Sequence, residues 1–281
     1  GFSLVFKFLG GFKMKRMKNT MCAGLILTLL CGLGLTGCGN SGTDGAADDQ
    51  AAGATIHVFA AASLTDALDE MIAQYQEESG NTVVAVYEAS GTLQKQISEG
   101  ADCDIFISAN QKYMNTLEEE GALAADTRKD LLGNNLTLIA SAEKADQITS
   151  VEDLLGDGVE MIAIGEPSEV PAGQYAQEMF ENLGMWEDIQ PKLVYAKNVR
   201  SVLNYVDGGD ADAGLVYHTD ALLLESGKII GDAPSDSYTA VNYPSAIMEA
   251  APQPEAAADF YEYLAGDDAK AIFESYGFTV L

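Results

Sequence analysis

Four segments place small or hydroxyl-bearing residues where a helix is predicted to begin. These helix starts lie at Ser63, Ser90, Pro171 and Asn198. The apolar run Ile56–Ala61 stops just before Ser63, which we interpret as a helix N-cap. A helix N-terminus leaves backbone N–H groups unpaired and carries roughly +0.5 charge, which suits it to bind an anion. Four converging helix starts would supply about +2, comparable with a dianion, without any lysine.

The ends of the predicted strands indicate where these helix starts meet. In open α/β sheets, ligands bind at the carboxyl ends of strands, and we expect all four starts to lie there. The hydroxyls of Ser63, Ser90 and Tyr217 add possible donors, and Gly91 permits close approach of another backbone. Taken singly, each of these residues could have a purely structural role. Serines commonly cap helices, and Tyr217 ends the apolar run that starts at Gly214, since an aromatic residue often lies at the end of a strand.

The charge of the chain limits its partners. Its 281 residues carry 43 acidic and 15 basic side chains, for a formal net charge of −28. Such acidity argues against binding nucleic acid or an anionic membrane through a basic patch. It also opposes long-range attraction of anions, so an anion site must act at short range.

The N-terminal region predicts export and a lipid anchor. A basic segment, Lys13–Lys18, precedes the apolar segment Met21–Leu35, which is short for a membrane-spanning helix. The sequence Leu-Thr-Gly-Cys ending at Cys38 resembles a bacterial lipoprotein signal. We therefore expect residues 1–37 to be a signal peptide, with 1–13 an upstream artefact of gene calling, and Cys38 to carry lipid. An uncleaved anchor is the alternative; either places the protein on the outer face of the cell membrane.

The rest of the chain predicts a small polar tether followed by an α/β body. Residues 38–54 form the lipidated cysteine and tether. Apolar runs then alternate with helical patterns, which indicates mainly parallel sheets flanked by helices. We expect strands near 55–61, 82–88, 104–108, 135–140, 160–164, 192–196 and 213–217. We expect helices near 63–79, 91–99, 111–121, 126–132, 151–155, 172–184, 199–208, 220–225, 254–265 and 267–276.

Two possible crossings divide the body into lobes. They lie at Leu132–Leu136 and Ser235–Asn242. The predicted first lobe is 55–133 plus 238–281, the second is 134–237, and a hinge joins them.

Nine ordered segments together resemble one family. They are Val58–Leu64, Ala89–Leu93, Asp104–Ala109, Leu131–Asn134, Gly165–Pro167, Val170–Gly173, Val199–Arg200, Gly214–Tyr217 and Ile272–Phe278. In order and context they are similar to the molybdate-binding proteins that deliver oxyanions to ABC importers. The resemblance covers Thr55 to Leu281.

The resemblance implies a fold, a ligand and a set of contacts. The fold would be the two-lobed periplasmic binding protein of type II, with the ligand cleft between lobes. Ser63 and Ser90 would offer backbone N–H and hydroxyl, Ala172 and Val199 backbone N–H, and Tyr217 its hydroxyl. The metal would be held only through its oxygens. The protein would be a monomeric receptor that passes molybdate, and tungstate, to an ABC importer permease, with no cofactor and no enzymatic activity.

One residue departs from this expectation. Glu88 places a carboxylate beside Ser90, where a small or apolar residue is expected. If it points inward, it weakens dianion binding or favours a protonated anion.

A pocket made only of donors predicts the ligand class. Molybdate and tungstate carry no proton at neutral pH, whereas phosphate keeps one and needs an acceptor. Sulfate carries no proton either, so only its smaller size distinguishes it. A receptor for another tetrahedral oxyanion such as sulfate therefore remains the alternative.

Other function classes find less support in the residues. The chain has only two histidines, His57 and His218, and no Gly-x-Ser-x-Gly motif for a hydrolase. After Cys38 only Cys103 remains, which we expect in the core; with two histidines, this argues against transition-metal capture. An organic-solute receptor would need an arginine, and only Arg128 and Arg200 follow the signal. We expect Arg200 to brace the site rather than touch the anion.

Overall fold

The computed structural model describes residues 53–281, whose strands form two β-sheets. The first sheet has the strand order β11-β4-β10-β3-β1-β2. Its strands are β1 (Thr55–Ala61), β2 (Thr82–Glu88), β3 (Ile105–Ile107), β4 (Lys129–Asn134), β10 (Val241–Ile247) and β11 (Thr279–Val280). The second sheet has the order β7-β6-β8-β5-β9. Its strands are β5 (Leu136–Ala140), β6 (Ile162–Gly165), β7 (Leu193–Ala196), β8 (Ala213–Tyr217) and β9 (Lys228–Asp232).

Both sheets are mixed, which corrects the expectation of mainly parallel sheets. Strands β2, β1 and β3 are parallel, as are β7, β6 and β8. The remaining pairs in each sheet are antiparallel. The chain leaves the first sheet through β4 and returns through β10, so these neighbouring strands run in opposite directions. The two crossings therefore introduce the antiparallel pairs that local patterns do not reveal.

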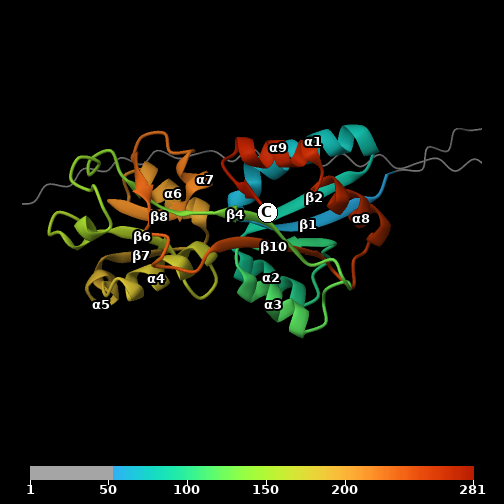
Figure 1. Cartoon of the computed structure of the whole chain (residues 1–281), viewed down its shortest axis with the longest axis horizontal. Helices are drawn as coiled ribbons and strands as arrows, with labels where there is room; N and C mark the ends of the chain where they lie inside the picture. Colours follow the sequence, from blue (N-terminus) through green and yellow to red (C-terminus); the bar gives the residue numbers. More distant parts are fainter. Residues whose placement is uncertain (1–52) are drawn as a thin grey trace, which may run out of the picture. The chain divides into compact units, whose positions relative to one another are not determined.

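Helices cover both faces of each sheet (Figure 1). Helices α1 and α9 lie on one face of the first sheet and α2 and α3 on the other, while α6 and α7 lie opposite α4 and α5 on the second sheet. The bounds are α1 (Thr65–Ser79), α2 (Ser90–Ser98), α3 (Gln111–Glu119), α4 (Pro171–Asn182), α5 (Trp186–Ile189), α6 (Val199–Asp207), α7 (His218–Ala221), α8 (Pro254–Tyr263) and α9 (Asp267–Ser275). Short 3₁₀ turns lie at Ala62–Leu64, Glu152–Leu155 and Gln190–Lys192.

Apolar spacing explains why these elements form and pack. Helix α1 buries Leu68, Met71, Ile72 and Tyr75, which recur on one face at helical spacing. Strand β1 is buried over its last four residues, as expected for a central strand covered on both faces. The core therefore fixes the carboxyl end of β1, where the Ser63 segment begins.

One predicted helix is wrong. Residues 126–132 were expected to be helical, but Lys129–Asn134 is strand β4, paired with β10 and β11. Cross-strand hydrogen bonds to two neighbours outweigh a weak local preference. The predicted elements also omitted β9, β10, β11 and the short helix α5.

The export signals lie outside the described residues. This applies to the signal peptide at 1–37, to Cys38 and to the tether as far as residue 52. Between residues 53 and 281, none of the helices has both the length and the apolar character required to cross a bilayer. The one cysteine in this part, Cys103, is buried as expected.

Candidate functional site

All five residues predicted to contact an anion line one small cavity. The space between its lining atoms is about 200 Å³, open solvent included, and the centre of a water molecule can occupy about 10 Å³ of it. Its walls come from both sheets and their helices. The lining residues are Ala61, Ala62, Ser63, Glu88, Ala89, Ser90, Ala109, Val170, Pro171, Ala172, Asn198, Val199 and Tyr217. Among these described residues there is no lysine or arginine, so donors here are main-chain N–H, hydroxyl and amide groups.

Ser63 lies inside a helical turn and does not cap it, which corrects its predicted N-cap role. The 3₁₀ turn Ala62–Leu64 follows the N-cap Ala61 and leads directly into α1. The Ser63 Oγ lies 2.9 Å from Tyr243 Oη, and Ser63 is only 3% exposed. The serine hydroxyl pairs with a distant phenol instead of a nearby backbone N–H, because β10 brings that phenol to the end of β1.

Ser90 is the first residue of α2, after the N-cap Ala89. Its Oγ accepts a hydrogen bond of 3.0 Å from the backbone N–H of Ala109, which leaves the Ser90 proton free for the cavity. The next residue, Gly91, makes the predicted close approach: its N–H donates to Glu169 O at 2.9 Å. A Cβ at Gly91 would lie 2.6 Å from that same oxygen, so a larger residue would push the two segments apart.

We call each sheet together with its flanking helices a lobe, and the lobe of the second sheet contributes the first turns of α4 and α6. Ala172 follows Pro171 at the start of α4, and Val199 is the first residue of α6. The side chain of Asn198 caps α6 by accepting from Ser201 N–H at 2.9 Å. Backbone N–H groups in a first turn have no carbonyl one turn earlier to pair with. Ala172 and Val199, both buried, therefore bring such groups to the cavity wall.

The Tyr217 hydroxyl is the sharpest indication that the cavity accommodates a polar solute. Tyr217 ends β8, is 1% exposed, and its Oη has no hydrogen-bond partner in the described part of the chain. Burial raises the pKa of Tyr217 well above its ordinary value, so the hydroxyl keeps its proton. An unpaired buried hydroxyl costs about 1–3 kcal/mol, which a bound acceptor would recover.

Glu88 does line the cavity, but its carboxylate is engaged at the edge. Its Oε2 accepts from Asn198 Nδ2 at 3.1 Å, and its Oε1 lies 3.8 Å from Lys197 Nζ. The side chain is 32% exposed. The charge is therefore partly solvated and partly paired with groups of the second lobe, which limits its repulsion of an anion.

Two polar clusters join the two lobes beside the cavity. The Glu169 cluster consists of Glu169, Thr92 and Lys95, with Lys95 Nζ 2.6 Å from Glu169 Oε1 and Thr92 Oγ1 3.0 Å from Oε2. The Arg200 cluster consists of Arg200, Asp66 and Asp220. The Arg200 guanidinium lies 2.6 Å from Asp66 and 2.5 Å from Asp220. Arg200 is therefore occupied by two carboxylates and does not line the cavity.

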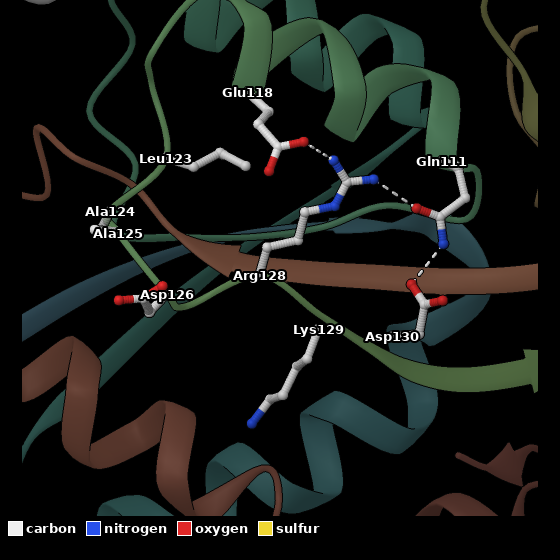
Figure 2. Close-up of a pocket in the computed structure, with 9 residues that line it drawn as sticks. All are labelled: Gln111, Glu118, Leu123, Ala124, Ala125, Asp126, Arg128, Lys129 and Asp130. Carbon is white, nitrogen blue, oxygen red and sulfur yellow. Dashed lines mark hydrogen bonds and ion pairs between the residues drawn. The ribbon is translucent and has the colours of Figure 1, made fainter.

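A larger surface hollow in the first lobe offers a contrasting environment (Figure 2). It measures about 1020 Å³, open solvent included, and contains both Arg128 and Lys129. Figure 2 shows Arg128 lying between Glu118 and Gln111, so its charge is already compensated. Three acidic side chains line this hollow, namely Glu118, Asp126 and Asp130. These carboxylates oppose anion binding there.

Possible metal ligands and the two histidines also lie within the described residues. Residues 53–281 contain no group of three or more His, Cys, Asp or Glu able to hold a metal ion. His57 and His218 each lie near a carboxylate, Asp104 at 3.5 Å and Asp232 at 3.2 Å, and neither lines the cavity.

Comparison with known proteins identifies the family. Residues 56–279 match the model of the family described as "Bacterial extracellular solute-binding protein". The chain is 41% identical over 231 residues to the molybdate-binding protein ModA of Escherichia coli (strain K12), covering 80% of this chain and 89% of that one. The chain belongs to this family of solute-binding proteins, among the relatives of ModA.

Two further relatives support this family assignment. YvgL of Bacillus subtilis (strain 168), whose name assigns it provisionally to the substrate-binding lipoproteins of ABC transporters, is 39% identical and covers 80% of this chain and 86% of its own. The Azotobacter vinelandii periplasmic molybdate-binding protein superimposes with a TM-score of 0.73 at 24% identity, over 80% of this chain and 99% of that one. The periplasmic binding protein fold is thereby confirmed, as is the assignment to extracytoplasmic solute-binding proteins rather than enzymes.

Several residues around the cavity were not singled out from the sequence. Tyr243 contacts Ser63 across 180 positions, and Glu169 contacts Gly91 and Lys95 from the other lobe. Tyr243 directly follows the second predicted crossing, Ser235–Asn242. No local pattern indicates which serine it meets.

Proposed function

We propose that this protein is the receptor that binds molybdate outside the cell membrane and delivers it to the permease of an ABC importer. The observation that carries the proposal is the cavity itself. Helix starts and hydroxyl groups from both lobes surround a small space with no lysine or arginine in its wall. The names of the relatives support molybdate as the ligand.

The proposed contacts follow from the groups that each residue presents. Ser63 and Ser90 donate through hydroxyl and backbone N–H, Ala172 and Val199 through backbone N–H, and Tyr217 through its unpaired hydroxyl. Preorganised neutral donors stabilise a dianion without a cationic side chain, in the manner of an anion held at helix N-termini. The metal itself takes no protein ligand and is held through its oxygens.

The same donors explain the expected choice of ligand. Molybdate and tungstate present only acceptors, which the donors satisfy. Hydrogenphosphate would leave its O–H without an acceptor, which is unfavourable in a buried site. Sulfate binding is weakened only by the smaller size of the ion, and tungstate is expected to bind as molybdate does.

We further infer that the receptor is tethered to the membrane as a monomer. The Leu-Thr-Gly-Cys sequence at Cys38 and the lipoprotein name of YvgL support a lipid there, after removal of residues 1–37. Residues 38–54 would link it to a first lobe of 55–133 plus 238–281 and a second lobe of 134–237. A hinge at the two crossings would let the lobes close on the ligand.

A thermal-unfolding screen tests the ligand. Molybdate, tungstate, sulfate and phosphate are added separately to the folded body. A ligand present at about 1,000 times its Kd stabilises the folded state by about 4 kcal/mol, which raises Tm measurably. We expect this for molybdate and tungstate. A shift with sulfate alone would favour the sulfate-receptor alternative, and no shift with any oxyanion would contradict the proposal.

Substitutions at Val199 test the main-chain contact. Proline is tolerated at the first position of a helix, so Val199→Pro removes one N–H while α6 persists. We expect a cost of about 1–3 kcal/mol in molybdate binding, measured by calorimetry. The matched control Val199→Ala keeps the N–H and should change little. Ser90→Asp should abolish binding, and normal affinity in this variant would contradict the placement of the site.

A further inference from the structure

A chain of buried and partly buried side-chain hydrogen bonds runs from the two crossing strands to Ser63. The Tyr243 hydroxyl, on β10, lies 2.9 Å from Ser63 Oγ. The Asn134 side chain, at the end of β4, donates from Nδ2 to Tyr243 Oη at 3.2 Å and to Thr219 Oγ1 at 3.0 Å. Strands β4 and β10 are antiparallel neighbours, so this chain of contacts lies where the polypeptide passes between the lobes.

The direction of each hydrogen bond follows from the chemistry of the groups. The Asn134 Oδ1 accepts from the backbone N–H of Asn135 at 2.9 Å, which orients the amide so that Nδ2 faces Tyr243. An amide nitrogen only donates, so the Tyr243 oxygen accepts from Asn134. In the described part of the chain, Ser63 Oγ is the acceptor that lies within reach of the Tyr243 proton.

Because Tyr243 is buried, its phenolic proton must be donated in a hydrogen bond. Tyr243 is fully buried, and a buried phenolic proton without an acceptor is unfavourable. Burial also raises the pKa of Tyr243 well above its ordinary value, so the proton stays on the oxygen around neutral pH. Tyr243 therefore donates to Ser63 Oγ, and the Ser63 proton is left to point into the cavity.

Ser90 reaches the same state by a different route. The backbone N–H of Ala109 donates to Ser90 Oγ, so the proton of Ser90 is likewise left for the cavity. Tyr217 offers a third hydroxyl with no protein partner among the described residues. Ser63 and Ser90 thus each accept one hydrogen bond from the protein and keep a proton for the cavity, and the Tyr217 proton is unpaired as well in the described part of the chain. Three hydroxyl protons directed at one space favour an anion that offers only acceptors.

We propose that Asn134 and Tyr243 are positioning residues that hold the Ser63 hydroxyl as a donor, so that the cavity favours an oxyanion with no proton of its own. This inference rests on the proposed function, since it concerns how the oxyanion site chooses its ligand. Neither residue lines the cavity, and each acts through Ser63.

A double-mutant cycle tests whether Tyr243 acts through Ser63. Molybdate Kd is measured by calorimetry for the unaltered protein, Tyr243→Phe, Ser63→Ala and the double variant. Tyr243→Phe removes one hydrogen bond, so we expect molybdate Kd to rise roughly threefold to tenfold. In the Ser63→Ala background, Tyr243→Phe should cause no further change, because the hydroxyl that it orients is absent.

Tyr261→Phe is a matched structural control. Tyr261 Oη lies 2.8 Å from Ser245 Oγ, so this pair is also a buried tyrosine–serine contact in the first lobe. Neither of its residues lines the cavity. We expect Tyr261→Phe to lower stability as Tyr243→Phe does while leaving molybdate Kd unchanged.

Sulfate and phosphate separate the effect of a proton from the effect of size. The two anions are similar in size, but only phosphate carries a proton at neutral pH. Their competition against molybdate is compared in the unaltered protein and in Tyr243→Phe. We expect sulfate to lose the same factor as molybdate and phosphate to lose less, because the freed Ser63 hydroxyl can turn to accept. Equal changes for both anions, or no competition by either, would contradict the selectivity part.

The outcomes distinguish this inference from the function on which it rests. If the unaltered protein does not bind molybdate, the proposed function fails. If it binds, an unchanged Kd in Tyr243→Phe or fully additive losses in the cycle would overturn the positioning role alone.

Discussion

The Glu169 cluster and the Arg200 cluster join the same two lobes but differ in their contact with water. In the Glu169 cluster, the Lys95 side chain is 58% exposed and the Glu169 side chain 37%. In the Arg200 cluster, Asp220 is fully buried and Arg200 is 23% exposed. The hydrogen bonds from Lys95 and then Thr92 lower the pKa of Glu169, whereas burial raises that of Asp220 to about 6 against the opposing effect of Arg200.

This difference in exposure decides what each contact contributes. Water and salt screen an exposed pair, which typically stabilises by about 0.2–1 kcal/mol. Removal of one member of a buried pair leaves an uncompensated charge and costs about 3–5 kcal/mol. We therefore expect the Arg200 cluster to support folding of the region around Ser63 and Val199, and the Glu169 cluster to adjust lobe closure only slightly.

The largest expected effect is that of Arg200→Met. It leaves the Asp220 carboxylate buried beside apolar atoms, and we expect about 3 kcal/mol lower unfolding free energy at pH 7. Urea unfolding measures this loss. Adding Asp220→Asn to the same chain should restore part of the stability, because it removes the isolated charge. A loss below about 1 kcal/mol would show that the pair behaves as an exposed one.

An intermediate effect is expected from acid. The pKa of Asp220 is about 6 in the folded state and about 4 when the chain is unfolded. Between these values the folded state binds a proton that the unfolded state does not, so this group favours folding more as pH falls. Relative to Asp220→Asn, the unfolding free energy of the unaltered protein should increase by up to about 3 kcal/mol when the pH falls from 7 to 4. Parallel stability–pH curves for the two proteins would contradict this.

The smallest effect is expected from Glu169→Gln. It removes the charge that pairs with Lys95 but keeps an acceptor for Thr92. Molybdate Kd should rise by less than about fivefold at low salt, and the difference should shrink at 1 M salt, where the Debye length is about 3 Å. Glu181→Gln, which makes the same charge change at an exposed position near the end of α4, is the control. A loss of molybdate affinity larger than tenfold that does not depend on salt would show that the Glu169 pair behaves as a buried pair, like that of Arg200.

Local sequence patterns predicted many of the strands and helices, but not which distant segments pair or contact one another. The runs that predict β1, β2 and β8 are apolar and end at helix-starting residues, so their bounds follow from the sequence. The helix prediction for residues 126–132 was wrong because β4 forms a strand only by pairing with its neighbours β10 and β11. Ser63 was assigned a capping role for a similar reason, since its actual partner is 180 residues away.

By itself, the sequence determined most of the strands and helices, the acidity of the body and the small residues at four helix starts. These depend on spacing and composition over short distances. Only the tertiary structure decided which groups meet: it gave Ser63 a phenol as partner, left the Tyr217 hydroxyl unpaired and buried Asp220 beside Arg200. The direction of a hydrogen bond and the strength of an ion pair depend on neighbours and on exclusion of water, and chain folding alone sets both.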